Sequence, residues 1–323
     1  MAEGEADGVR ILFWGTPDFA LPSFRALLGE DHDIVGVVTQ PDRPAGRGRR
    51  LHESPVKQLA REEFIPILQP ERVRGNAEFM ESIRALEPDL SVVIAYGQIL
   101  PREILELPCS GSINVHASLL PELRGAAPIN WAIIRGYEET GITIMRMAEE
   151  MDAGPILLQV RESIAPDERA SDLWTRLSEL GAAALVETLA LLEAGVIVEI
   201  EQEHKRATFA PRLTRGHAHV DWTRPAVEID RLIRGLDETP GAWNQHGEHP
   251  LKLFRPRPDP DYAHDALSGT VLVVDATDPA DGILVAAGEG AVWIREVQPA
   301  GKRRMTATEW VRGRGVSLGD RLT

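Results

Sequence analysis

A strand–helix–strand pattern near the N-terminus constrains the fold of this 323-residue chain more than any other feature. Residues 9–14 form an apolar run that stops at Gly15, residues 17–29 suit a helix, and residues 33–39 are rich in valine. Two apolar strands joined by a helix predict a parallel sheet with helices on its faces. The turn after the first strand has a single glycine and lacks both the Gly-x-Gly-x-x-Gly and the P-loop spacing. We therefore expect a Rossmann-like, mostly parallel α/β sheet that binds no nucleotide cofactor.

The length of the chain fits two domains better than one. After Gly195 the pattern changes to short β-type runs punctuated by proline and glycine, which favours a small β-barrel. We therefore expect an α/β domain over residues 1–195, a linker over 196–207, and a smaller β domain over 208–323. The predicted strands of the second domain are residues 251–254, 270–274, 283–287 and 291–297.

Composition restricts the cellular setting. A single cysteine, Cys109, excludes an intramolecular disulfide and suits a reducing compartment. The acidic N-terminus has no apolar core of a signal peptide, and no apolar run reaches the roughly 18 residues that span a bilayer. The sequence therefore predicts a cytoplasmic protein with no membrane partner.

The net charge of −15 is unevenly distributed, because residues 206–323 contain 16 basic and 16 acidic residues. All excess acid lies in the first part, yet residues 40–52 form a Pro/Gly-rich loop with four arginines and one aspartate. An acidic protein can still bind a polyanion through such a cluster. The loop can be an ordinary solvated one, but its arginine density favours a role in binding phosphates through Arg43, Arg47, Arg49 and Arg50.

Asn114 and His116 are two residues apart at the end of a predicted short strand over residues 112–115. That spacing points both side chains to the same side of an extended chain. Taken alone, such a pair is more often structural than catalytic. An acidic loop that contains Asp152 follows soon afterwards, and strand ends on a rigid sheet are where α/β proteins place their chemistry.

The run Asn-Val-His-Ala-Ser-Leu-Leu-Pro-Glu-Leu-Arg-Gly-Ala-Ala-Pro, residues 114–128, closely resembles the signature of the 10-formyltetrahydrofolate-dependent formyltransferases. The resemblance is greatest to the members that act on methionine carried by initiator tRNA. It extends over nearly the whole chain through four further segments, residues 13–20, 39–48, 95–97 and 298–302.

The resemblance implies formyl transfer from 10-formyltetrahydrofolate to the methionine amine of charged initiator tRNA, in translation initiation. Such a reaction needs a donor for the developing oxyanion and a base for the amine proton. Asn114, His116 and Asp152 match the catalytic residues of the family and can supply these groups. The resemblance also implies an OB-type barrel as the second domain. It implies a folate site lined by Ala95, Tyr96, Gly97, Gln98, Ile99, Leu100, Ser118, Leu119, Leu120 and Pro121.

The tRNA-specific members use the arginine loop on the acceptor stem and the second domain to hold the tRNA. By resemblance, Lys302, Arg303 and Arg304 would contact the phosphates of the tRNA. Two departures weaken the match: Glu122 and Leu123 stand where the family has a basic and then an aromatic residue. Small residues also differ, with alanine at position 117 for the usual glycine and at 153 for a common threonine.

Other interpretations stay open at this point. The same catalytic residues could formylate an amino sugar or another small amine, which would not need the arginine loop. A non-catalytic RNA-binding protein is a rival that the intact catalytic residues argue against. Two histidine pairs have ligand-like spacing, but they lie in a polar region and we expect no metal. The two pairs are His217 with His219 and His246 with His249. We also expect a monomer.

Overall fold

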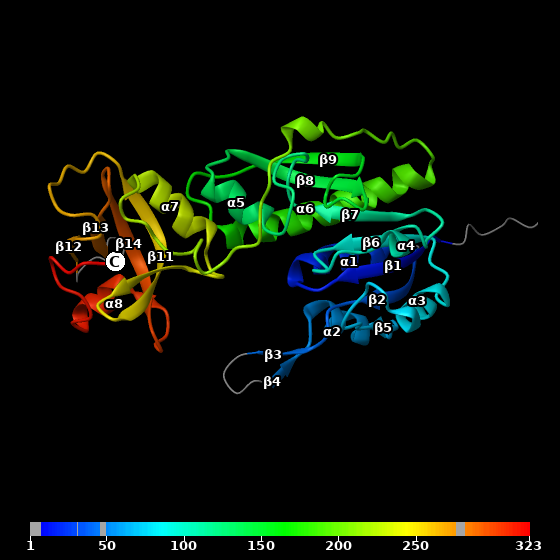
Figure 1. The fold of residues 1–323 in the computed structure, drawn as a ribbon, viewed down its shortest axis with the longest axis horizontal. Helices are drawn as coiled ribbons and strands as arrows, with labels where there is room; N and C mark the ends of the chain where they lie inside the picture. Colours follow the sequence, from blue (N-terminus) through cyan, green and yellow to red (C-terminus); the bar gives the residue numbers. More distant parts are fainter. Residues whose placement is uncertain (1–7, 31, 46–49, 276–281) are drawn as a thin grey trace, which may run out of the picture. The chain divides into compact units, whose positions relative to one another are not determined.

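A computed structural model of the protein describes residues 8–30, 32–45, 50–275 and 282–323 (Figure 1). The chain forms two compact units. The first contains the described residues up to Pro128 together with Glu139–Ser163 and Trp174–Pro211, and the second contains Ile129–Glu138, Ile164–Leu173 and the described part of Arg212–Thr323. The predicted domain boundaries at residues 195 and 207 stay predictions.

The first unit is built on a seven-stranded sheet with the order β5-β2-β1-β6-β7-β8-β9. The first five strands in this order pair in parallel, and β8 and β9 continue the sheet antiparallel. This arrangement confirms the predicted mostly parallel α/β sheet. Its strands are β1 (Arg10–Gly15), β2 (Asp33–Val38), β5 (Ile67–Leu68), β6 (Leu90–Ile94), β7 (Ser112–His116), β8 (Glu139–Arg146) and β9 (Ile156–Ser163).

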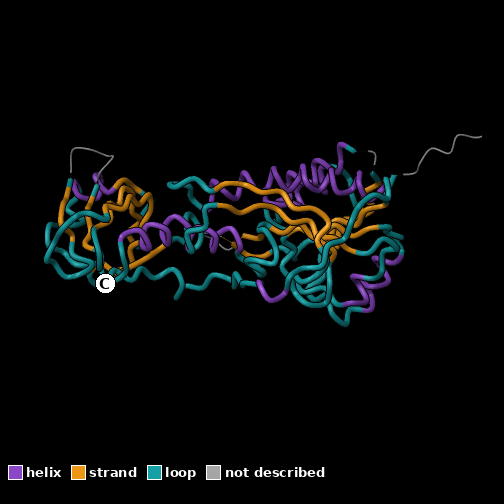
Figure 2. Tube along the Cα trace, turned by 90° about the horizontal axis from the view of Figure 1, so that it is seen from above, coloured by secondary structure: helices purple, strands orange, loops and turns teal. Residues whose placement is uncertain are grey.

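Helices cover both faces of this sheet, and in Figure 2 they lie above and below the strands. The alternation of side chains along β1 explains this. Trp14 packs with Phe79 on one face, while its neighbour Phe13 stacks on Phe24 on the other. The helical segments of the unit are η1 (Asp18–Ala20), α1 (Leu21–Gly29), α2 (Pro55–Glu62), α3 (Ala77–Arg84), α4 (Arg102–Leu105) and η2 (His204–Arg206); α5 (Pro128–Ile134) and α6 (Ala170–Glu193) include residues of both units.

The arginine-rich segment, predicted as a loop over residues 40–52, contains two short strands. β3 (Arg43–Ala45) and β4 (Arg50–His52) pair antiparallel, with Arg43 opposite His52. Proline and glycine at four positions argued for irregular structure, but a two-stranded ribbon needs only three extended residues on each side. The interpretation as a loop was therefore incomplete.

The second unit contains an antiparallel sheet with the strand order β10-β11-β14-β13-β12, and β15 pairs with β14. This confirms a β-rich second unit, while the OB type stays a prediction. A capping box at Thr306 and Glu309 starts the last helix. The elements are α7 (Ala226–Gly235), β10 (Ala242–His246), β11 (His249–Asp259), β12 (Val271–Val274), β13 (Ile283–Ala286), β14 (Ala291–Pro299), β15 (Met305–Thr306) and α8 (Ala307–Arg312).

Candidate active site

Strand β7 carries the first two predicted catalytic residues. It lies between β6 and β8, with Asn114 opposite Val93 on one side and Met145 on the other. His116 is 6 % exposed, whereas Asn114 is partly exposed. Among the residues that the structure describes, the Asn114 amide has no hydrogen-bond partner, so its two N–H groups can serve a ligand.

His116 lies between a backbone carbonyl and a carboxylate. Its Nε2 is 3.1 Å from the carbonyl oxygen of Leu123, and its Nδ1 is 3.8 Å from Oδ2 of Asp152. A carbonyl oxygen only accepts, so Nε2 carries the hydrogen and donates it. The Nδ1 atom is thereby directed towards the Asp152 carboxylate. The structure thus brings the three predicted catalytic residues together at the end of β7.

The Asp152 carboxylate is held in place by the main chain. Its Oδ2 accepts a hydrogen bond of 2.7 Å from the backbone N–H of Gly125, and the side chain is only 15 % exposed. The backbone of Asp152 is left-handed, with φ of +53°. Residues other than glycine adopt that conformation infrequently, and aspartate does so more readily than most.

The loop after β7 is tied to β8 by side-chain hydrogen bonds. Thr143 donates its hydroxyl to the carbonyl of Ser118 at 2.6 Å and accepts from the N–H of Leu120 at 3.1 Å. Leu120 is 3 % exposed and Ser118 is 1 % exposed. These two predicted folate residues are therefore part of a rigid loop whose main chain shapes the site.

The two positions that depart from the family signature have clear structural roles. Leu123 is buried at 1 % exposure, and its backbone both accepts from His116 and donates to the hydroxyl of Thr208 at 2.9 Å. Glu122 lies 3.9 Å from Nη2 of Arg206. The contact between position 123 and His116 is therefore made by the main chain of Leu123 and not by its side chain.

The segment after β6 runs beside the end of β7, because the two strands are parallel neighbours. Ala95 and Ile99 are exposed there, whereas Leu100 is 2 % exposed. Tyr96 is also 2 % exposed, and its ring packs edge-on against Trp14. Burial raises the pKa of the Tyr96 phenol. Its side chain thus belongs to the core, and the predicted contribution of residues 95–100 to a folate site stays a prediction.

The predicted phosphate-binding arginines of residues 40–52 are only partly described. Arg43 is exposed on β3 and Arg50 begins β4, while Arg47 and Arg49 lie outside the described residues. Asp42, the one acidic residue of this segment, is paired with Lys57 at 2.6 Å. That aspartate is therefore already neutralised by a partner outside the segment.

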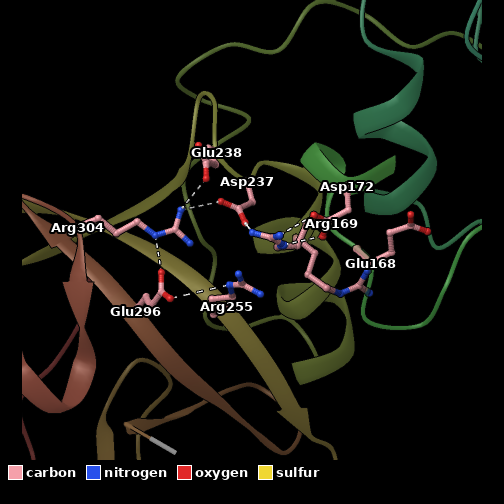
Figure 3. A network of polar contacts seen from close by, with 9 residues as sticks. Glu168, Arg169, Asp172, Asp237, Glu238, Arg255, Glu296 and Arg304 are labelled. Carbon is pink, nitrogen blue, oxygen red and sulfur yellow. Dashed lines mark hydrogen bonds and ion pairs between the residues drawn. The ribbon is translucent and has the colours of Figure 1, made fainter. Parts of the chain in front are cut away.

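The members of the basic cluster of the second unit differ in their surroundings. Lys302 and Arg303 are exposed, and Arg303 pairs with Glu309 at 3.3 Å. Arg304 instead contacts three carboxylates, those of Asp237 at 3.2 Å, Glu238 at 3.5 Å and Glu296 (Figure 3). Its guanidinium also lies 4.0 Å from the ring centroid of Phe254.

The Asp237 carboxylate, 1 % exposed, also binds Arg169 at 3.1 Å. The network of Figure 3 therefore uses the charge of Arg304 to compensate a buried acid. The predicted contact of Arg304 with tRNA rests on the family resemblance alone.

Three of the four histidines with ligand-like spacing have other partners. His217 packs against Trp131, His219 packs against Trp243, and His246 bonds Asp320 at 3.1 Å. Within the described ranges, no three His, Cys, Asp or Glu side chains gather as a metal ion would require. No helix in the same part of the chain is long and apolar enough to cross a membrane.

Sequence reasoning missed two buried residues next to Asp152. Arg124, inside the recognised signature, is 2 % exposed, and Gln202, inside the predicted linker, is 5 % exposed. They bond each other at 2.7 Å. Position within the signature could have pointed to Arg124, but no local pattern distinguishes Gln202.

Comparison with known proteins assigns this chain to the formyl transferases. Residues 9–189 match the family described as formyl transferase, and residues 212–315 match the formyl transferase C-terminal domain. The chain belongs to this family. It is 47 % identical over 315 residues to the methionyl-tRNA formyltransferase of Trichlorobacter lovleyi, covering 98 % of this chain and 97 % of that protein.

Two solved structures share the fold. HypX from Aquifex aeolicus in complex with tetrahydrofolic acid has a TM-score of 0.65 at 18 % identity, over 97 % of this chain and 50 % of that one. WlaRD, a sugar 3N-formyl transferase, has a TM-score of 0.64 at 16 % identity, over 91 % of this chain and 99 % of that one. At such identities these two resemblances describe architecture only.

Proposed function

We propose that this protein transfers the formyl group of 10-formyltetrahydrofolate to the α-amino group of methionine carried on initiator tRNA. The observation that carries the proposal is the near full-length identity of 47 % to a methionyl-tRNA formyltransferase. The sugar formyl transferase is far more distant, at 16 % identity. The protein is then a translation-initiation enzyme, which we expect to act as a cytoplasmic monomer.

The side chains at the end of β7 suit this chemistry. In formyl transfer the amine nitrogen bonds to the formyl carbon and the bond from that carbon to N10 of the folate breaks. The amine loses a proton, and the released N10 gains one. Negative charge develops on the formyl oxygen, where a fixed amide donor such as Asn114 stabilises it. His116 can receive the amine proton or donate to the oxyanion. Asp152, 3.8 Å from Nδ1 of His116, stabilises the protonated imidazole.

The proposed binding surfaces follow from resemblance and from exposure. The folate lies against residues 95–100, of which Ala95 and Ile99 are exposed, and against the loop of residues 118–121. The arginines of residues 40–52 contact the acceptor stem, and Lys302 and Arg303 contact phosphates elsewhere on the tRNA. A guanidinium binds phosphate through its N–H groups, whereas one that is shared among several carboxylates, as that of Arg304 is, loses part of this capacity.

The test is formyl transfer from 10-formyltetrahydrofolate to methionine charged on initiator tRNA, with free methionine and a panel of amino sugars alongside. Transfer confined to the charged tRNA supports the proposal. Transfer to a small amine keeps the catalytic residues and overturns the substrate. Tight binding of charged tRNA with no turnover identifies a non-catalytic RNA-binding protein instead.

The catalytic residues are tested by Asn114→Ala and His116→Ala. Each variant should lower kcat far more than it weakens tRNA binding, because neither side chain lies on the proposed tRNA surfaces. Equal losses in kcat and in tRNA affinity would contradict the catalytic assignment.

A further inference from the structure

The segment of residues 200–210, here called the strap, is bound along the two loops that carry the active site. Ile200 pairs with Ile156 through two backbone hydrogen bonds of 2.8 and 2.9 Å. Further along, Arg124 donates its N–H to the carbonyl of Thr208 at 2.9 Å and accepts from the N–H of Ala210 at 2.7 Å. A segment with the sequence character of a linker therefore forms part of the site in the first unit.

Gln202 is the side chain of the strap that reaches the catalytic loop. Its Nε2 donates to the backbone carbonyls of Asp152 at 2.9 Å and Gly154 at 2.7 Å. Its Oε1 accepts from Nε and Nη2 of Arg124 at 3.2 and 2.7 Å. Both ends of the amide are thus in use, with two donated and two accepted hydrogen bonds. A carboxylate of the same shape can replace only the accepting half.

Arg124 holds the other end of this arrangement. Its Nη2 lies 3.0 Å from Nδ1 of His204, and because a guanidinium only donates, that nitrogen accepts. Its Nη1 lies 3.7 Å from Oε1 of Glu150, in the acidic loop before Asp152. A fully buried arginine with this many partners fixes the relative position of the strap and the loop.

Asp152 is consequently restrained from two sides. The N–H of Gly125 holds its carboxylate, and the Gln202 amide holds its main chain in the left-handed conformation. We propose that Gln202 and Arg124 are positioning residues that keep the Asp152 carboxylate at His116 during formyl transfer. The inference rests on the proposed function, since it assigns the strap a part in that reaction.

The main test is Gln202→Glu, which preserves size and the contact with Arg124 but directs a carboxylate oxygen at two carbonyl oxygens. The Asp152 loop should shift, and kcat should fall on the order of 10²-fold, as for a misplacement of about 1 Å. The KM for charged tRNA should stay within about twofold of wild type, because Gln202 contacts the Asp152 loop and not a proposed tRNA surface. Gln58→Glu, the same charge change at an exposed position of α2, should change neither constant.

A second readout does not depend on activity. Amide hydrogen exchange of peptides spanning residues 122–127 and 149–155 should become faster in Gln202→Glu, while the strands of the sheet keep wild-type protection. The measurement stays informative even if wild type fails to formylate charged tRNA. That failure would overturn the proposed function, whereas unchanged exchange in these peptides would overturn the positioning role.

Arg124→Lys provides an independent variant should Gln202→Glu not fold. It keeps the charge but cannot bind Oε1 of Gln202 with two N–H groups, so it should lower kcat with the KM for tRNA retained. Wild-type kcat in a folded variant would refute the proposal. Matching losses in kcat, KM and protection across the whole first unit would also refute it, because they would indicate a purely structural role.

Discussion

The Asp152→Asn variant tests the electrostatic part of the proposed mechanism. Asparagine has the shape of aspartate, and its amide oxygen can still accept the hydrogen bond that Gly125 donates to Oδ2 at 2.7 Å. The loop should therefore keep its conformation. What the substitution removes is the negative charge 3.8 Å from Nδ1 of His116.

The size of the effect follows from that distance. A pair of unit charges at 3.8 Å, in surroundings with an effective dielectric constant of about 20, interacts by about 4 kcal/mol. Both side chains are largely shielded, with exposures of 6 % for His116 and 15 % for Asp152, so this dielectric constant is appropriate. If the protonated imidazole forms in the transition state, Asp152→Asn removes about 4 kcal/mol of its stabilisation. This corresponds to a fall in kcat of about 10³-fold.

The assay is single-turnover formyl transfer to charged initiator tRNA at saturating folate, with tRNA affinity measured separately by filter binding. Affinity should stay near wild type, since the charge removed is inside the site. Asp33→Asn is the matched control, because Asp33 makes a surface ion pair with Arg10 and is 58 % exposed. It should leave the rate unchanged.

A fall in rate of less than about tenfold in Asp152→Asn would refute the reasoning, because a charge worth 1.4 kcal/mol or less cannot be the main stabiliser of the imidazolium. A large loss that is accompanied by equally weak tRNA binding would instead indicate that the loop had moved.

Three further predictions concern other parts of the molecule. Asp237→Ala leaves two arginines without the buried carboxylate they share, so urea unfolding of the second unit should show a loss of about 2–3 kcal/mol; a loss below about 0.5 kcal/mol would contradict the role of the network. Hydrogen bonds from Lys57 first, and then from a glutamine, hold the pKa of Asp42 below its ordinary value. The stability this provides is present above about pH 4 and lost as the pH falls through the folded-state pKa, so the stability difference between wild type and Asp42→Asn should shrink below about pH 4; a constant difference would refute this. Replacing the four arginines of residues 40–52 should flatten the salt dependence of tRNA binding by a slope of about 3 if each contacts one phosphate, and an unchanged slope would exclude the segment from the interface.

Local pattern was sufficient for the architecture of the first unit. The apolar runs around Gly15 and the valine-rich run that follows are strands β1 and β2, and they pair in parallel as expected. The strands predicted after residue 250 also correspond to β11–β14. Hydrophobic periodicity carries this information because it reflects burial of neighbouring residues within one element.

Local pattern was weaker where a few residues decide the structure. The short ribbon of β3 and β4 was expected to be a loop, because its proline and glycine residues predict irregular structure. Strands of three residues are too short to show a contrary pattern in the sequence. Tyr96 was assigned to a ligand site by its place in a motif, yet its ring is buried against Trp14. A motif identifies a segment, but it does not say which side chains of that segment turn inward.

By itself the sequence determined the parallel sheet, the β-rich second unit, and the presence of an amide and an imidazole side by side on one strand. These features depend on spacings of two to about ten residues. Within such spacings the backbone geometry of a strand or helix fixes the direction in which each side chain points. Only the tertiary structure decided what surrounds them: Asp152 reaches His116 across 36 positions, and Gln202 reaches Arg124 across 78. Contacts at such separations are selected by the packing of the whole unit, because each buried polar group must find its partner wherever the fold brings one close.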